Sequence, residues 1–161
     1  MADFGVYFDT GVLVKLYYLE PGSQKVAARA AKQTSLPFPR LAEIELRNAL
    51  RVLHGRKLLT ADELSATLTM IDDDLRASRL QRLLPDPVSV HECAEDLSRR
   101  HAARTKCRAL DLLHVSHAVV SDIPRFFTGD HRQADLAKCA GLHVEFLEVR
   151  FRGRSSGSRR D

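Results

Sequence analysis

The chain has 161 residues, of which 44% are hydrophobic and 29% are charged, and its formal net charge is +4. That length suits one domain with a sizeable core, and that composition excludes a disordered or fibrous protein. No apolar run approaches the roughly 20 residues that span a bilayer, so we predict no membrane segment.

The cellular compartment is predicted from features that the sequence lacks. The first residues show no basic and apolar pattern of a secretory signal. Three scattered cysteines form neither a disulfide framework nor a paired zinc motif. We therefore expect a cytoplasmic protein.

The excess positive charge lies at one end of the chain. Residues 150–161 contain five arginines and one aspartate, which leaves 20 basic and 20 acidic residues in 1–149. We predict a folded domain over 1–149 and a flexible basic tail over 150–161. The net charge therefore says little about the functional face of the domain.

The first half of the chain alternates between short strand-like runs and apolar helical patterns. A capping box of Thr60 and Glu63 begins one helix, and Ser23 is the predicted N-cap of another. We predict strands at Val6–Phe8 and Leu36–Pro39, and helices over 12–17, 23–32, 41–57 and 60–80.

The second half repeats the alternation after Pro85-Asp86-Pro87 breaks the chain before Val88-Ser89-Val90. We predict helices over 91–103, 109–120 and 131–140, and strands at 126–128 and 144–149. Strands separated by helices, without hairpin turns, predict a mainly parallel sheet with helices on both faces. The expected fold class is α/β, as three α/β/α layers plus a helical hairpin over 41–80.

Two aspartates follow predicted strands, at the sheet edge where parallel α/β proteins bind ligands. Asp9 comes directly after the first strand, and Asp130 follows the strand that ends at Thr128. Each also precedes a helix, so N-capping is the alternative interpretation. Thr10 could cap the first helix equally well, which would leave Asp9 available for another role.

Asp111 is a single acidic residue among large apolar residues of a predicted helix. A carboxylate in such a place needs a charged partner or a metal ion. The alternative is a salt bridge to Arg108 or His114, three residues away on either side. We interpret His114, and likewise His117, as structural partners of the Asp111 region rather than zinc ligands.

Several carboxylates that met at one place would repel one another unless a divalent cation neutralised them. Ligands that are all oxygen favour Mg²⁺ or Mn²⁺ over zinc. Such ions serve the hydrolysis of phosphate esters, because they activate water and stabilise charge on the attacked phosphate.

Four blocks of sequence carry a resemblance to a known family. They are Asp9-Thr10-Gly11-Val12-Leu13-Val14-Lys15, Glu45-Leu46-Arg47-Asn48-Ala49-Leu50, Leu110-Asp111-Leu112-Leu113-His114-Val115-Ser116-His117-Ala118 and Phe127-Thr128-Gly129-Asp130-His131-Arg132-Gln133. In this order and spacing, from about Val6 to Phe146, the chain resembles the PIN-domain ribonucleases, and specifically the VapC-like toxins of type II toxin–antitoxin systems.

The resemblance implies a PIN-like fold and a set of site residues. Asp9, Glu45, Asp111 and Asp130 would line a site for one or two Mg²⁺ or Mn²⁺ ions, with Thr10 and Thr128 as polar supports. Glu45 is chosen because Ala49 and Leu50 follow it at the family's spacing, and Glu43 is the fallback. The chain departs from the family at Gly11, where Ser or Asn is commoner, and at Gly129, where close relatives often have an aromatic residue.

The implied activity is metal-dependent endoribonuclease hydrolysis of RNA phosphodiester bonds. The implied biological role is a toxin that a cognate antitoxin neutralises, with a homodimer as the expected assembly and the 41–80 hairpin as a candidate interface. The alternatives are a PIN nuclease that processes RNA without an antitoxin, and a catalytically silent module that binds RNA or protein. A phosphatase of the haloacid-dehalogenase type is disfavoured, because Gly11 stands where that chemistry needs a second aspartate.

Basic residues near the predicted carboxylates are candidates for binding the RNA backbone. Five cations precede Asp111, and two more polar residues follow Glu45. The alternative is that this run of charge is only a solvated helix face. The candidates are Arg47, Asn48, Arg99, Arg100, Arg104, Lys106 and Arg108.

Overall fold

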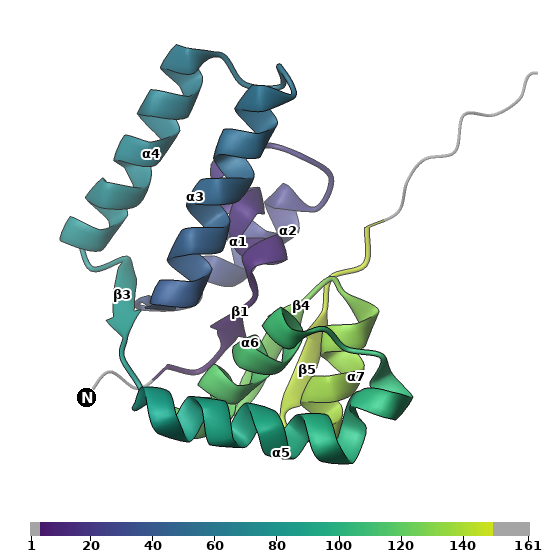
Figure 1. Cartoon of the computed structure of the whole chain (residues 1–161). Coiled ribbons are helices and arrows are strands. Elements are labelled where there is room, and N and C mark those ends of the chain that lie inside the picture. Colours follow the sequence, from purple (N-terminus) through teal and green to yellow (C-terminus); the bar gives the residue numbers. More distant parts are fainter. Residues whose placement is uncertain (1–3, 150–161) are drawn as a thin grey trace, which may run out of the picture.

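The computed structural model describes residues 4–149 of the chain. Within that part, five strands alternate with seven helices (Figure 1). Their order is β1 (Tyr7–Phe8), α1 (Thr10–Tyr17), α2 (Ser23–Ala30), β2 (Leu36–Pro39), α3 (Arg40–Gly55), α4 (Ala61–Arg76), β3 (Leu80–Leu83), α5 (Pro87–Thr105), α6 (Ala109–Val120), β4 (Arg125–Thr128), α7 (His131–Cys139) and β5 (His143–Phe146). The predicted tail at 150–161 lies outside the described residues.

All strand pairs in the described part are parallel, as the alternation of strands and helices predicts. Hydrogen bonding divides the strands into a three-stranded sheet, in the order β1-β4-β5, and a two-stranded sheet of β2 and β3. In the larger sheet Tyr7 lies opposite Phe126 and Phe8 opposite Phe127. The backbone ladder continues past β1, because the Asp9 N–H donates to the Phe127 carbonyl at 3.1 Å.

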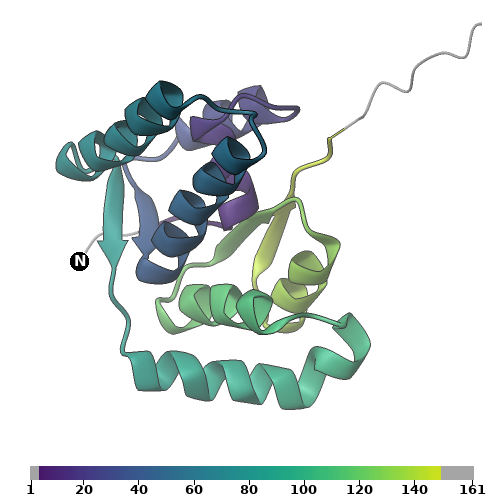
Figure 2. The same ribbon diagram turned by 45° about the horizontal axis from the view of Figure 1, so that its top comes forward.

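Successive residues of the central strands point to opposite faces and build two separate cores. Phe8 and Phe127 pack with the first four helices, whereas Tyr7 and Phe126 pack with α5, α6 and α7. Figure 2 shows α6 lying between α5 and the sheet. The prediction of three α/β/α layers is confirmed.

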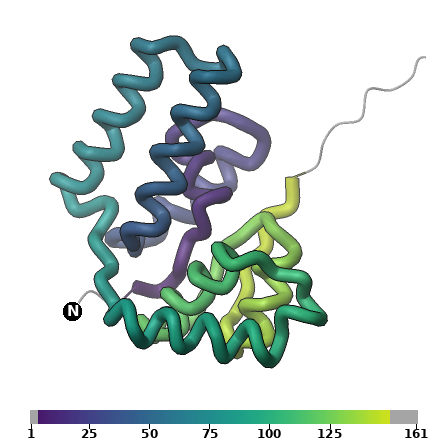
Figure 3. Tube along the Cα trace, viewed as in Figure 1, coloured from purple at the N-terminus to yellow at the C-terminus, as the bar shows by residue number. Residues whose placement is uncertain are grey.

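The predicted helical hairpin consists of α3 and α4, which run side by side and project from the rest of the domain (Figure 3). Buried Ala42, Leu46 and Leu50 recur at helical spacing and attach α3 to the first core. The capping box at the start of α4 is present, because Thr60 Oγ1 accepts from the Glu63 N–H and Glu63 accepts from the Thr60 N–H.

The sequence prediction missed β3 and extended the preceding helix to about Leu80. The helix ends at Arg76, and Ser78 then adopts a left-handed backbone conformation with φ of 57°. Leu80 and Leu83 are buried, and the strand is completed by pairing with β2, more than 40 residues earlier in the chain. No local pattern specifies that partner, which is why the prediction failed here.

Two helix starts also differ from the prediction. Pro87 is the first residue of α5 and Asp86 caps it by accepting from the Ser89 N–H, so Val88-Ser89-Val90 is already helical. Proline favours the first helical position because its missing N–H has no partner there in any helix. Ser23 is not an N-cap, because Gly22 occupies that position and Ser23 Oγ instead accepts from the Glu20 N–H at 3.0 Å.

None of the helices within residues 4–149 combines the length and the apolar character that crossing a bilayer requires.

Candidate active site

Asp9 stands where β1 ends and α1 begins, with its side chain only 2% exposed. Its Oδ1 caps the helix by accepting from the Val12 N–H at 2.8 Å. Its Oδ2 accepts from the hydroxyl of Thr128, at the end of β4. The capping interpretation of Asp9 is therefore correct for one oxygen, while the other faces the neighbouring strand.

Burial raises the pKa of Asp9 above its ordinary value, and the charge of Asp130 acts in the same direction. Hydrogen bonds from Thr128 and Val12 oppose that rise without cancelling it. Burial also raises the pKa of Tyr7, with further contributions from the charges of Asp9 and Glu45. The protein thus gathers negative charge in a place where water solvates it poorly.

Glu45 reaches the same region from the first half of α3. Its Oε2 accepts from the Thr10 hydroxyl at 2.7 Å and forms a second hydrogen bond with His114 Nε2. Burial acts to raise the pKa of Glu45, but the hydrogen bond and charge of His114, with the Thr10 hydroxyl, bring it below its ordinary value.

His114 is 1% exposed and connects α6 to both β1 and α3. Its Nδ1 lies 2.8 Å from the Tyr7 hydroxyl, and its Nε2 contacts Glu45 and lies 3.3 Å from Thr10 Oγ1. Since an ionised carboxylate can only accept, Nε2 donates to Glu45. The predicted partnership with Asp111 is wrong, because His114 serves Glu45 instead.

His117 does not belong to the Asp111 region either. Its Nδ1 bonds with the carbonyl of Leu113, one turn earlier on α6, at 2.7 Å. It lines a different pocket, with Leu41 and Val90.

Glu43, the fallback for Glu45, lies on a different side of α3 and takes part in an ion-pair cluster. Arg82 donates to both of its oxygens, at 2.6 and 3.0 Å, and Arg40 and Arg47 contribute further bonds. The Arg82 guanidinium is the largest cause that lowers the pKa of Glu43 to about 2. Glu43 therefore bonds with arginines, whereas Glu45 bonds with Thr10 and His114.

Asp111 lies in the first turn of α6 and is 6% exposed. Its Oδ2 accepts from the backbone N–H of Arg108 at 2.7 Å, and its Oδ1 accepts from Gln133 Nε2 at 3.0 Å. The described residues show no salt bridge from Asp111 to Arg108 or His114, so the predicted alternative is not realised.

Asp130 caps α7 by accepting from the N–H groups of Arg132 and Gln133, at 2.7 and 3.4 Å. Burial acts to raise its pKa, but Arg132 and the backbone hydrogen bonds hold it below the ordinary value. Thr128 bridges two candidates, since its hydroxyl donates to Asp9 and accepts from the Asp130 N–H at 3.0 Å.

Bridging residues connect three of the four predicted acidic residues, one of these links passing through the backbone of Asp130, and Glu45 is held by the chain neighbour of Asp9. Thr128 links Asp9 to Asp130, Gln133 links Asp130 to Asp111, and Thr10, next to Asp9, holds Glu45. Sequence reasoning missed Gln133 and Tyr7. The only available signal for Gln133 was its position one helical turn after Asp130.

The donor chemistry of this cluster suits a hard divalent cation, because four carboxylates supply only oxygen and one of them is buried with a raised pKa. Within residues 4–149, however, no three side chains of His, Cys, Asp or Glu are arranged so that they could hold one ion. Each carboxylate is instead turned toward its own protein partner. The residue types fit a metal, and coordination would require some of these side chains to rotate.

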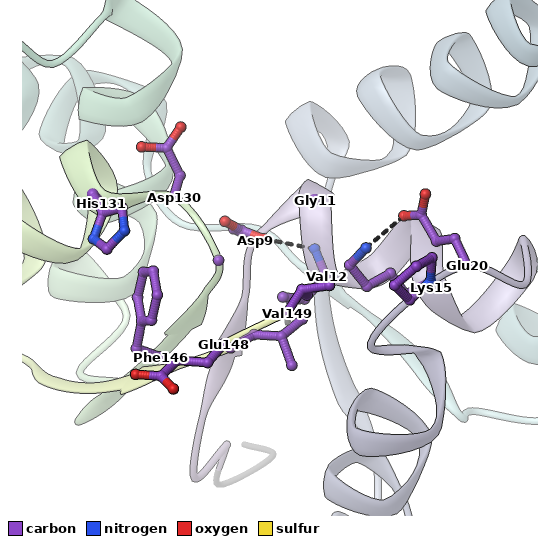
Figure 4. A pocket seen from close by; sticks show the side chains of 13 residues that line it. Asp9, Gly11, Val12, Lys15, Glu20, Asp130, His131, Phe146, Glu148 and Val149 are labelled. Carbon is purple, nitrogen blue, oxygen red and sulfur yellow. Dashed lines mark hydrogen bonds and ion pairs between the residues drawn. The ribbon is translucent and has the colours of Figure 1, made fainter. Parts of the chain in front are cut away.

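A pocket of about 740 Å³ opens beside the carboxylates, with Asp9 and Asp130 in its wall (Figure 4). Gly11 and Gly129 also line it, so the departures from the family pattern both fall here. A Cβ atom at Gly11 would lie 3.4 Å from Asp9 Oδ1, which is an ordinary van der Waals distance.

The basic candidates do not form one patch. Arg47 is committed to Glu43 and Asp72, and Arg99 pairs with Asp96 on the same helix, as Arg100 does. Arg104 contacts Cys139 at 2.6 Å. Three of the candidates, all exposed, remain near site elements: Asn48 on α3, and Lys106 and Arg108 between α5 and α6.

The sequence of this chain matches a known protein family. The model of the PIN domain matches residues 6–138, which is most of the chain. The chain belongs to the PIN-domain family. PIN domains are generally nucleases, and PIN nucleases typically use divalent metal ions. No curated protein matches the chain.

Two solved structures share the fold of this chain. VapBC2 from Rickettsia felis, bound to a DNA fragment from its promoter, aligns with a TM-score of 0.62 at 16% identity, covering 89% of this chain and 98% of that chain. FitAcB from Neisseria gonorrhoeae aligns with a TM-score of 0.63 at 16% identity, covering 86% and 95%. At this identity the likeness shows a common fold.

Proposed function

We propose that this PIN domain is a metal-dependent endoribonuclease that acts as the toxin of a toxin–antitoxin pair. The observation that carries the nuclease proposal is the grouping of acidic residues at the ends of β1 and β4 and on α3 and α6, in which Thr128 contacts both Asp9 and Asp130. Gln133 in turn contacts both Asp130 and Asp111. Helix capping accounts for one oxygen of Asp9, but burial disfavours the ionisation of this carboxylate, and a divalent cation would favour it.

In this proposal Asp9, Glu45, Asp111 and Asp130 would hold one or two Mg²⁺ or Mn²⁺ ions. A divalent ion bound there lowers the pKa of water and stabilises the charge that develops on phosphate oxygen. No side chain needs to form a covalent bond with the substrate.

The other residues of the site would orient the carboxylates. Thr128 and the Val12 N–H hold Asp9, while Thr10 and His114 hold Glu45. Gln133 and the Arg108 N–H hold Asp111. These hydrogen bonds keep the carboxylates in one region, and the positioning of charged groups by their neighbours is a main source of catalysis in phosphoryl transfer.

The test is cleavage of a mixed-sequence single-stranded RNA with Mn²⁺, with Mg²⁺ and with chelator. We expect cleavage that needs the metal and that Asp9→Asn or Asp111→Asn reduces at least a hundredfold. Asp135→Asn is the matched control, because Asp135 is an exposed aspartate on α7 that pairs with Lys138. Full activity of a folded Asp9→Asn protein would exclude the proposed mechanism, and DNA of the same sequence tests the preference for RNA.

The toxin role is supported by the two structural neighbours, which come from the VapBC and FitAB toxin–antitoxin systems. The α3–α4 hairpin offers apolar surface for a partner or a second copy, since Ile44 is 68% exposed and Met70 50%. A toxin that attacks cellular RNA would act in the cytoplasm.

The product of a neighbouring reading frame should suppress RNA cleavage when added in equal amount, whereas a processing nuclease would stay active. Light scattering of the purified protein tests the homodimer.

A further inference from the structure

The pocket beside Asp9 and Asp130 contains an aromatic pair that the proposed chemistry does not use. His131, the first residue of α7, stacks on Phe146, the last residue of β5, with ring centroids 4.5 Å apart and planes 27° from parallel. Both rings line the pocket, and Figure 4 shows them on the side where Asp130 lies.

Core packing does not account for this pair. His131 is exposed and Phe146 is half-buried, and neither belongs to the two hydrophobic cores of the described residues. The core pairs of this protein, such as Tyr7 stacked on Phe126, are fully buried. A stacked pair in a pocket wall is therefore available to a ligand.

Space for a ligand extends from the carboxylates to the aromatic pair. Gly11 and Gly129 present only backbone to the pocket, and its volume of about 740 Å³ is within the range of small-molecule sites. A ligand bound at Asp9 and Asp130 could place an adjoining group against His131.

The charges around the pocket favour an uncharged, flat group at this position. Lys15, a basic lining residue, is bound to Glu20 at 2.6 Å, and Glu148 adds a further carboxylate. The acidic side chains of this pocket wall would repel an additional phosphate group. Aromatic side chains next to a backbone-binding site are instead how proteins hold the bases of single-stranded nucleic acid.

We propose that His131 and Phe146 form a stacking subsite for the nucleobase adjoining the scissile phosphate of single-stranded RNA. This inference rests on the proposed ribonuclease function, and it assigns the binding of the nucleobase to these two residues. Because stacking on a ring face works for every base, the subsite holds the nucleotide without by itself selecting a sequence.

The first test compares steady-state kinetics on a 12-nucleotide single-stranded RNA that the wild-type protein cleaves. We expect His131→Ala and Phe146→Leu each to raise KM about tenfold with kcat nearly unchanged, as for lost binding that is equal in ground and transition states. Phe146→Trp should keep the wild-type KM, since it restores a stacking face. His143→Ala is the control, because His143 is an exposed histidine at the other end of β5 and outside the pocket lining.

The second test places a single abasic ribose at each position around the mapped cleavage site. The wild-type protein should lose about tenfold in kcat/KM at one position next to the scissile bond, and His131→Ala should lose little more there. Unchanged KM in both His131→Ala and Phe146→Leu, or equal losses at every abasic position, would overturn the stacking subsite while leaving the nuclease intact. A wild-type protein that cleaves no RNA would overturn the proposed function, and this subsite with it.

Discussion

Gln133 Nε2 donates to Asp111 Oδ1 at 3.0 Å, while the backbone N–H of the same residue donates to Asp130. One residue of α7 thus contacts both the carboxylate that caps its own helix and a carboxylate on α6. Its own Oε1 is buried without a protein partner among residues 4–149. A buried amide oxygen normally accepts a hydrogen bond, so the Oε1 atom of Gln133 is open to a donor.

Replacing Gln133 by Leu should impair catalysis without unfolding the protein. The change removes the donor to Asp111 and leaves the helix cap at Asp130 intact, because that cap uses the backbone. We expect kcat on single-stranded RNA to fall about tenfold, the usual scale for a supporting residue of a metal site. Gln81→Leu, on the exposed side of β3, is the control. Equal kcat for wild type and Gln133→Leu would show that Asp111 needs no such support.

The choice between the two glutamates of α3 can be made by one pair of conservative variants. Glu45→Gln should abolish metal-dependent cleavage, because Glu45 contacts Thr10 and His114 at the site. Glu43→Gln should keep most of the activity, because Glu43 faces Arg82 and Arg47 instead. Initial rates at saturating Mn²⁺ measure the difference, and the reverse pattern would make Glu43 the ligand.

His114→Phe should lower kcat by about ten- to a hundredfold with little change in KM. Phenylalanine fills the buried space beside Tyr7, but it cannot donate to Glu45, which would then be free to turn away. His117→Phe provides the comparison, since His117 lies one turn further along α6 and bonds with a backbone carbonyl of its own helix. Similar losses in both variants would indicate damage to α6 rather than to the orientation of Glu45.

Some parts of this fold follow from local sequence patterns, and others depend on contacts between residues far apart in the chain. The spacing of Leu46 and Leu50 predicts α3, and the alternation of Tyr7 and Phe8 between two cores follows from strand geometry. By contrast, β3 depends on pairing with β2, and the His114–Glu45 bond joins residues 69 apart in the chain. Such contacts depend on tertiary packing, for which a single sequence has no periodic signal.

The site residues divide in the same way. Asp9 and Asp130 were predictable because strand ends and helix starts are local features. Arg47, in contrast, looked like an RNA-binding residue but is committed to Glu43 and Asp72. Whether a charged side chain can bind a ligand depends on the residues that the fold places beside it.

Metal binding should stabilise the protein through the candidate carboxylates. An ion that binds only the native state adds about 2.7 kcal/mol at a hundred times its Kd, which corresponds to roughly 5–10 °C in Tm for a domain of this size. We expect Mn²⁺ to raise Tm by that amount in wild type and in Asp135→Asn, and chelator to reverse it. Asp9→Asn should lose the shift, and an equal shift in that variant would place the ion elsewhere.

Glu43 should make the protein sensitive to acid. Its pKa is lowered from 4.5 to about 2. A depressed carboxyl pKa contributes stability that is fully present above pH 4.5 and is lost as the pH falls toward 2. The full shift corresponds to roughly 3 kcal/mol, and partial exposure of the ion-pair cluster reduces this to about 1–2 kcal/mol.

Urea unfolding at pH 7 and pH 3 measures that contribution. Wild type should be more stable than Glu43→Gln at pH 7, and the difference should shrink at pH 3. At pH 3 the carboxyl of Glu43 is largely protonated in the unfolded chain but still ionised in the folded protein, so proton binding favours the unfolded state. Glu92→Gln, an exposed glutamate of α5, should follow wild type at both pH values. A difference between wild type and Glu43→Gln that stays constant with pH would mean that packing, rather than the charge of Glu43, holds the cluster together.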